Sequence, residues 1–217
     1  MHRSLRSAAT AGTVLLLAMA LTACVQENSP VDPAPTVPAG ASSTPETSVA
    51  PEPADQTVVI SVDGIAVNGG PLVPFDKREL VIDALADAMS VAPEEEPLEG
   101  PYGGEYTAYV WDGLRATDDD SRIVVSVTAD APSVSFTTPE GVGLGASRAE
   151  ALSAGAEDEW DEDGDGIADY LKIGMREVSG TRSLVHPGQV GVEYVLLVLT
   201  EDVVTGIQSG ANDYSDI

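Results

Sequence analysis

The chain has 217 residues, 43% of them apolar, and a formal net charge of -26 at pH 7. Its ten basic residues face 36 acidic ones and form no basic stripe, which excludes nucleic-acid binding through phosphate neutralisation. The single cysteine excludes an intramolecular disulfide, and the sequence contains no P-loop or dinucleotide-binding fingerprint. An acidic surface of this kind keeps a protein soluble and can attract divalent cations or basic partners.

Residues 1–23 have the layout of a lipoprotein signal peptide. Two arginines precede an apolar run from Ala11 to Ala23, which is too short to span a bilayer comfortably. The run ends in Leu21-Thr22-Ala23-Cys24, which resembles the lipobox of bacterial lipoproteins. The resemblance implies that Cys24 is lipidated, becomes the new N-terminus and anchors the chain on the extracytoplasmic face of a cell membrane. The alternative is an ordinary cleaved signal followed by a chance cysteine.

Residues 24–56 are predicted to be the lipidated cysteine and a disordered tether rich in Pro, Ser, Thr and Ala. The segment holds seven of the fifteen prolines and hardly any large apolar residue. It therefore cannot bury enough surface to offset the entropy lost on ordering. With polyproline II character, the tether would extend to about 100 Å at ~3.1 Å per residue.

The length of residues 57–217 suits one extracytoplasmic domain or two very small ones. Their pattern predicts an α+β fold with an antiparallel sheet and two short helices. Asp63-Gly64 separates two β-rich runs and predicts a hairpin, since both residues tolerate positive φ. Residues 75–89 predict a helix with Asp76 as its N-cap and Glu79 three residues later. The apolar stripe of this helix consists of Leu80, Val81, Ala84, Leu85, Ala88 and Met89.

The middle of this domain predicts a loop followed by strands. Prolines and glycines favour a loop over residues 92–104. Residues 105–116 and 121–129 are two β-rich runs separated by polar residues, which is typical of a hairpin with a longer loop. Residues 133–136 predict a further short strand.

The second part of the domain repeats the order of helix, strand, turn and strand. Ser147 as N-cap and Glu150 predict a short helix, and two strands flank Glu201-Asp202. We therefore predict two related halves, at about residues 57–138 and 139–217. The stretches EYTAYVWDGL and TPEGVGLGASRAE, with the acidic-tipped terminal hairpin, resemble bacterial lipoprotein domains of the small-protein-A and β-lactamase-inhibitory-protein type. The resemblance implies an α+β domain that binds other proteins or supports envelope assembly, and no functional residue carries over.

The most specific motif is DEDGDGIADYL, which begins at Asp161. Counting Asp161 as position one, carboxylates stand at positions one, three, five and nine, and a glycine stands at position six. Calcium takes six to eight oxygen ligands in a flexible cage, which alternate carboxylates on a tightly turning loop can supply. We therefore predict that Ca²⁺ is a cofactor. Its predicted ligands are Asp161, Asp163, Asp165, Asp169 and the backbone carbonyl of Ile167.

Position twelve of this motif departs from an EF-hand, because it is Lys172 and not a bidentate glutamate. The motif more closely resembles the Asp-rich calcium loops of thrombospondin type-3-like repeats, which usually occur in arrays, whereas this chain has one copy. Water or the acidic residues 157–159 would then complete the ligand set. Magnesium suits the motif less, because it demands octahedral geometry and keeps its waters. The alternative is a solvated acidic insertion.

No catalytic residue is predicted. His186 is the only histidine once His2 leaves with the signal, and the sequence has no G-x-S-x-G motif. Trp160, beside the acidic loop, is predicted to mark a binding surface, whereas Trp111 fits the core. The sequence thus predicts a membrane-anchored binding or envelope-interaction module with a protein or cell-envelope partner. The alternatives are a cell-wall hydrolase that uses acidic residues and a passive surface lipoprotein.

Overall fold

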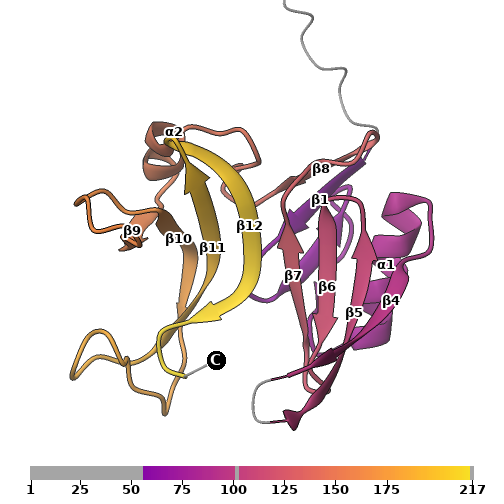
Figure 1. The fold of residues 1–217 in the computed structure, drawn as a ribbon, viewed down its shortest axis with the longest axis horizontal. Helices are drawn as coiled ribbons and strands as arrows, with labels where there is room; N and C mark the ends of the chain where they lie inside the picture. The colour runs from indigo at the N-terminus through magenta and orange to yellow at the C-terminus, as the bar shows by residue number, and fades with distance from the viewer. Residues whose placement is uncertain (1–55, 101–102, 216–217) are drawn as a thin grey trace, which may run out of the picture. The chain divides into compact units, whose positions relative to one another are not determined.

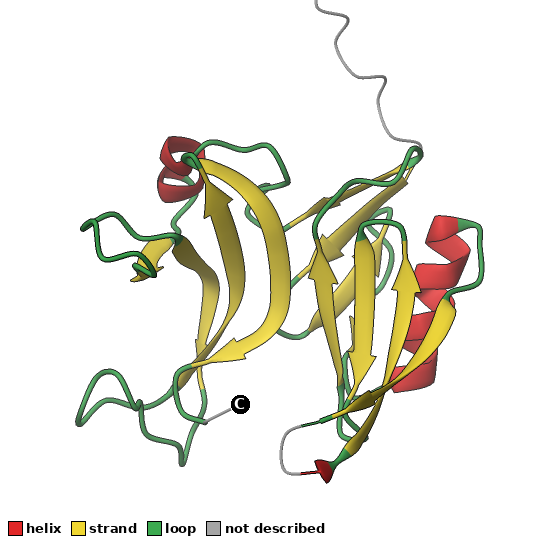
Figure 2. Ribbon diagram, in the orientation of Figure 1, coloured by secondary structure: helices red, strands yellow, loops and turns green. Residues whose placement is uncertain are grey.

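The computed structural model describes residues 56–100 and 103–215, which belong to one unit, Val49–Ile217 (Figure 1). The predicted signal peptide, Cys24 and the predicted tether up to residue 55 lie outside the described residues. Within the described part, twelve strands form two sheets and two α-helices accompany them. Strand is the dominant element (Figure 2). The predicted α+β class therefore holds in a coarse form, as a mostly β domain with an antiparallel sheet and two helices.

The smaller sheet consists of β1 (Gln56–Ile60), β2 (Gly64–Val67), β3 (Val73–Pro74) and β8 (Val134–Thr137). Its strand order is β3-β2-β1-β8. The β1–β2 hairpin turns at Asp63-Gly64, which confirms the prediction, and Val59 lies opposite Ala66. β8, the predicted short strand, runs parallel to β1 although the two lie far apart in the sequence.

The larger sheet consists of β4 (Glu94–Glu99), β5 (Glu105–Trp111), β6 (Leu114–Asp118), β7 (Ile123–Val127), β9 (Glu157–Trp160), β10 (Tyr170–Glu177), β11 (Val192–Thr200) and β12 (Val203–Asn212). Its order is β4-β5-β6-β7-β12-β11-β10-β9, and every neighbouring pair is antiparallel. The edge strands β4 and β9 are rich in acidic residues, whose charge discourages pairing with another chain.

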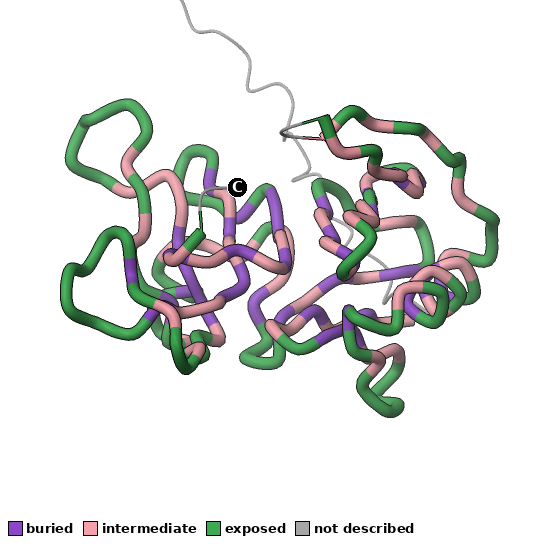
Figure 3. The backbone as a smooth tube through the Cα atoms, turned by 90° about the horizontal axis from the view of Figure 1, so that it is seen from below, coloured by how far each residue is buried: buried purple, intermediate pink, exposed green. Residues whose placement is uncertain are grey.

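One hydrophobic core joins the two sheets and the helices. Side chains alternate along each strand, so β7 buries Ile123, Val125 and Val127 and leaves its other two residues only partly covered. The buried segments follow the strands, and the exposed segments are mainly loops (Figure 3). Trp111 is 6% exposed, as predicted for a core residue, and its Nε1–H donates to the carbonyl of Val91 at 2.9 Å.

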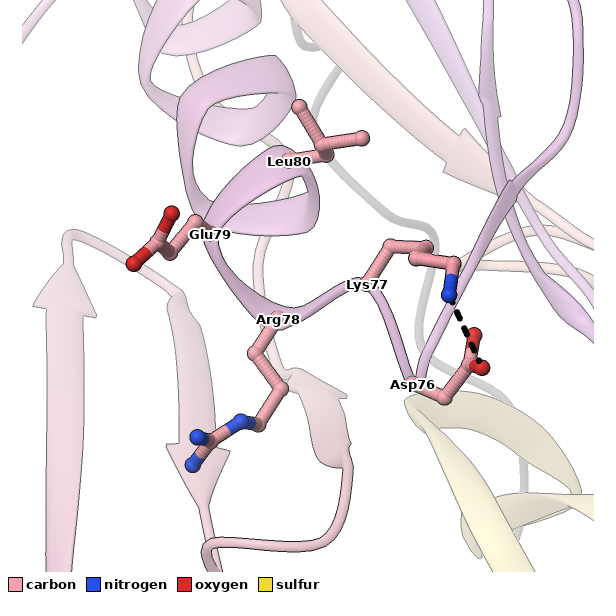
Figure 4. A pocket seen from close by; sticks show the side chains of 5 residues that line it. All are labelled: Asp76, Lys77, Arg78, Glu79 and Leu80. Carbon is pink, nitrogen blue, oxygen red and sulfur yellow. Dashed lines mark ion pairs between the residues drawn. The ribbon is translucent and has the colours of Figure 1, made fainter.

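α1 (Arg78–Met89) packs beside β2 and β3, but its first turn differs from the prediction. The predicted N-cap Asp76 is wrong. The N-cap residue is Lys77, whose side chain has only donors and therefore cannot accept a capping bond. Its backbone N–H donates to the carbonyl of Pro74 in a turn that leaves Asp76 outside the helix. Asp76 pairs instead with Lys77, across 3.4 Å between Oδ2 and Nζ (Figure 4). Leu80, predicted in the apolar stripe, lines the open depression of about 270 Å³ drawn there and is 57% exposed.

α2 (Arg148–Ser153) begins as predicted. The backbone N–H of Glu150 donates to Ser147 Oγ at 3.3 Å, and the backbone N–H of Ser147 donates to Glu150 Oε2 at 2.7 Å. This reciprocal pair satisfies donors that would otherwise lack partners at the helix start. The main chain of Arg148 is also fixed, because its N–H donates to the carbonyl of Asp202 at 2.8 Å.

Two predictions for the middle of the domain are wrong. Residues 92–104 are not all loop, since β4 forms within them. As an edge strand, β4 can hold Pro97 and leave most of its glutamates exposed to water. Residues 105–116 are not one strand, because the chain turns at Asp112-Gly113 and separates β5 from β6.

Candidate metal centre

The acidic motif forms the loop between β9 and β10, at one edge of the larger sheet (Figure 1). The two strands are antiparallel, and Trp160 pairs with Tyr170 across the base of the loop. The chain therefore leaves β9, forms a closed loop and enters β10 at Tyr170, where the acidic part of the motif has ended. The loop lies at the surface, and only its base is held by the sheet.

The carboxylate of Asp161 organises the first part of the loop. Its Oδ1 accepts the N–H of Gly164 at 2.7 Å, and its Oδ2 accepts the N–H of Gly166 at 2.8 Å. Gly164 has φ +77° and Gly166 has φ +92°, a backbone region that residues with a Cβ rarely adopt. The two glycines thus allow the chain to wrap around one carboxylate.

Three more bonds within the loop involve the other aspartates. Asp163 Oδ1 accepts the N–H of Asp165 at 3.0 Å, and Asp165 Oδ1 accepts the N–H of Ile167 at 2.8 Å. Asp169 Oδ2 accepts the N–H of Glu162 at 2.8 Å, which closes the loop across seven residues. Each of these side chains keeps oxygen lone pairs for a further partner.

Three of the five predicted ligands come together. One carboxylate oxygen from each of Asp161, Asp163 and Asp169 lies within 4.8 Å of the other two, and the described residues contain one such group. Oxygens that bind one calcium ion at 2.3–2.6 Å can be at most about 5 Å apart, so this spacing fits a shared ion. Asp165 and Ile167 lie outside this triad.

An open cavity of about 240 Å³ lies beside the triad. Its lining includes Asp165 and Ile167 as well as residues that the sequence analysis missed. The full lining is Arg148, Asp163, Asp165, Ile167, Asp169, Leu199, Glu201 and Asp202. The side chain of Ile167 is 53% exposed and that of Trp160, the other residue predicted here, is 61% exposed. Trp160 is thus available to a partner, although it does not line this cavity.

Arg148 is the one basic side chain that lines this cavity. Its Nε lies 2.6 Å from Asp202 Oδ1 in the β11–β12 turn, and its Nη2 donates to the carbonyl of Ala168 at 2.5 Å. Nη1 lies 3.5 Å from Asp158 Oδ1, and the side chain is only 17% exposed. Arg148 therefore ties the end of the acidic loop to α2, β9 and the β11–β12 turn. The capping signal at Ser147 predicted where Arg148 lies in the helix, but nothing local pointed to its partners.

Two neighbouring acidic side chains are occupied by other partners. Glu159 Oε2 lies 2.8 Å from the Nζ of Lys172, and Glu159 Oε1 accepts the hydroxyl of Tyr194 at 2.9 Å. Burial raises the pKa of Tyr194, and the bond to Glu159 raises it further. Glu162 Oε2 accepts the hydroxyl of Tyr170 at 2.9 Å, and this bond is the main reason that the pKa of Tyr170 is raised. Glu159 is thus held away from the ligand role considered for residues 157–159.

No protein-family model, curated protein or solved structure matches the chain. Neither helix in the described part is long and apolar enough to span a membrane.

Proposed function

We propose that the chain is a lipid-anchored extracytoplasmic binding module whose β9–β10 loop binds Ca²⁺. The observation that carries the calcium proposal is the approach of oxygens from Asp161, Asp163 and Asp169 to within 4.8 Å. All three are carboxylate oxygens, the donors that hard cations prefer. Asp165, the carbonyl of Ile167 and water would complete the set.

Calcium would neutralise carboxylates that repel one another at this spacing. An ion that binds the folded loop and not the unfolded chain also stabilises the fold by mass action, by about 2.7 kcal/mol at 100 times its Kd. A surface loop with remaining freedom suits the variable coordination of calcium better than the strict octahedron of magnesium. The proposed role of the ion is to order the edge of the sheet beside Trp160.

The anchor rests on the lipobox-like Leu21-Thr22-Ala23-Cys24 directly after an apolar signal core. The module would meet a protein or another component of the cell envelope through the surface around Trp160, since exposed tryptophans are favoured at interfaces.

We also propose that the domain contains two related halves, in keeping with the resemblance to small-protein-A-like lipoprotein domains. Two features support this. Each helix precedes four strands of the larger sheet, β4 to β7 after α1 and β9 to β12 after α2. In that sheet both groups run in the same order away from the β7–β12 junction, each from its last strand to its first.

Calorimetric titration of Ca²⁺ into the unlipidated chain from Cys24 to Ile217 tests the metal site. We expect saturable binding and a higher melting temperature with calcium. The variant Asp163→Asn/Asp169→Asn should abolish both effects, because asparagine keeps an acceptor for the loop N–H but removes two negative charges.

The matched control is Asp83→Asn/Asp87→Asn, which removes the same charge from exposed positions of α1 and should bind calcium like the original chain. Absence of heat at millimolar calcium, or equal binding by the Asp163→Asn/Asp169→Asn variant, would refute the site. Equal binding of magnesium would refute the assignment to calcium.

A further inference from the structure

The loop between β10 and β11 differs in charge from the rest of the molecule. From Val178 to Val192 the sequence contains no aspartate or glutamate, in a chain with 36 acidic residues. Arg182 and His186 are its only ionisable side chains. Among the described residues, Arg182 is also the one lysine or arginine that forms no ion pair, and its side chain is exposed.

This loop exposes aliphatic side chains. Leu184 is 58% exposed, Val185 is 55% exposed and Val190 is 42% exposed, and we call these three residues the apolar tip. The loop projects at the lower left of Figure 1, between β10 and β11. Apolar side chains gathered on one exposed loop mark an interaction surface more often than isolated ones do.

Hydrogen bonds hold the apolar tip in its exposed position. The N–H of Leu184 donates to the carbonyl of Asp213 at 2.7 Å, which fastens the loop to the C-terminal segment. Ser183 is 7% exposed, its N–H donates to the carbonyl of Gln189 at 3.2 Å, and its Oγ accepts the N–H of His186 at 2.8 Å. The apolar tip therefore stands on a closed, anchored loop that already presents it to a partner.

We propose that the apolar tip docks on a membrane surface with anionic headgroups. Aliphatic side chains can enter the interface between headgroups and acyl chains, while Arg182 pairs with lipid phosphates. The acidic remainder of the surface is repelled by the same headgroups over roughly 8 Å at physiological salt, so the acid-free loop is the part that can approach. The distribution of charge thus determines both the proposed partner, an anionic membrane, and the orientation of the domain, with the acid-free loop toward the lipids.

Because the predicted tether holds the domain near the bilayer, even a weak contact between the apolar tip and the lipids is enough to keep the loop docked. This step rests on the proposed lipid anchor and is independent of the proposed calcium site. The tether would end at residue 55, because Gln56 belongs to β1. Residues 25–55 would extend to about 100 Å at ~3.1 Å per residue, long enough for the loop to turn toward the bilayer. A tethered site also experiences an effective concentration on the order of millimolar, which keeps a weakly bound loop largely docked.

Hydrogen exchange on anchored protein tests the proposal. Cys24 is the only cysteine, so a maleimide phospholipid attached to the chain from Cys24 to Ile217 anchors it whether or not cells lipidate this residue. On vesicles of phosphatidylcholine and phosphatidylglycerol, amides within residues 182–190 should exchange roughly tenfold more slowly than in the unanchored chain. The β9–β10 loop should be unaffected.

Two double variants with matched exposure make the test specific. Leu184→Ser/Val185→Ser should remove the protection, whereas Leu80→Ser/Val91→Ser, which changes a leucine and a valine that are each 57% exposed, should retain it. Unchanged exchange of residues 182–190 on anchoring, or equal protection on phosphatidylcholine alone, would overturn the proposal. Protection that grows with protein concentration in lipid-free solution would assign the apolar tip to a second copy of the chain.

Discussion

Lys172 accounts for the absence of the EF-hand glutamate from the acidic motif. It occupies position twelve, but this position belongs to β10, where Lys172 is 8% exposed and pairs with Glu159. Tyr194 satisfies the second oxygen of Glu159, so these three groups form a closed polar cluster. A buried lysine is tolerated only when its charge is paired in this way.

We predict that Lys172→Met lowers the free energy of unfolding by about 3 kcal/mol, because the largely buried Glu159 charge keeps its bond from Tyr194 but loses its counter-ion. Removing both charges, with Lys172→Met/Glu159→Gln, should recover most of this loss. Urea unfolding measures both values. The exposed ion pair Arg115–Glu96 serves as the control, and Arg115→Met should cost less than about 1 kcal/mol. Equal costs for the two single variants would contradict the prediction.

Local signals were sufficient to predict some elements. The β1–β2 turn and the capped start of α2 were predicted because each depends on a few adjacent residues, such as Asp63-Gly64 or Ser147 with Glu150. β4 could not be predicted, because its glutamates and proline form a strand only through pairing with β5.

The same distinction, between features set by adjacent residues and features set by the tertiary fold, applies to the candidate metal centre. The spacing of the aspartates predicted that Asp161, Asp163 and Asp169 converge, since the loop between β9 and β10 is short, but it also included Asp165, which lies outside the triad. Arg148 and Asp202 are 54 residues apart, and only the tertiary fold brings them together beside the loop.

The turn at Asp112-Gly113 is predicted to be the less tolerant of two glycine turns. Gly113 has φ +71°, and a Cβ on it would lie 2.7 Å from the backbone oxygen of Ala129. Gly166 also has positive φ, at +92°, but a Cβ there would meet no atom within 4 Å. Gly166→Ala should therefore cost about 1–2 kcal/mol from backbone strain alone, and Gly113→Ala should cost more. Thermal unfolding of both variants checks the order, and an equal or reversed order would contradict it.

On the scale of the whole molecule, Glu193 connects segments from both sheets. Its Oε1 accepts the hydroxyl of Tyr214 at 2.5 Å and lies 3.5 Å from Arg122 Nη1 in the β6–β7 turn. Its Oε2 pairs with Arg176 of β10, which also pairs with Asp63 in the turn of the smaller sheet. The cluster therefore joins the C-terminal segment, the larger sheet and the smaller sheet.

The same contacts shift the pKa values of Glu193 and Tyr214. Burial alone would raise the pKa of Glu193, but the bonds from Tyr214 and Arg176 outweigh burial and hold it below its usual value. Burial and the bond to Glu193 raise the pKa of Tyr214 to about 12. Both shifts favour a charged Glu193 beside a neutral Tyr214, so each must contribute to stability as the pH changes.

We predict that stability falls at both ends of the pH range. The contribution of Glu193 is present above its unfolded pKa of about 4.3 and is lost as the pH falls through the lower folded value. The contribution of Tyr214 is present below its unfolded pKa of about 10 and is lost as the pH rises through about 12.

Urea unfolding of the original chain and of the Tyr214→Phe variant across this pH range measures the effect. The free energy of unfolding should fall less steeply at alkaline pH in the variant. Tyr194 also has a raised pKa, so the informative quantity is the difference in stability between the original chain and Tyr214→Phe at each pH. Parallel curves for the original chain and Tyr214→Phe between pH ~10 and ~12 would mean that the bond to Glu193 does not hold the C-terminal segment on the domain.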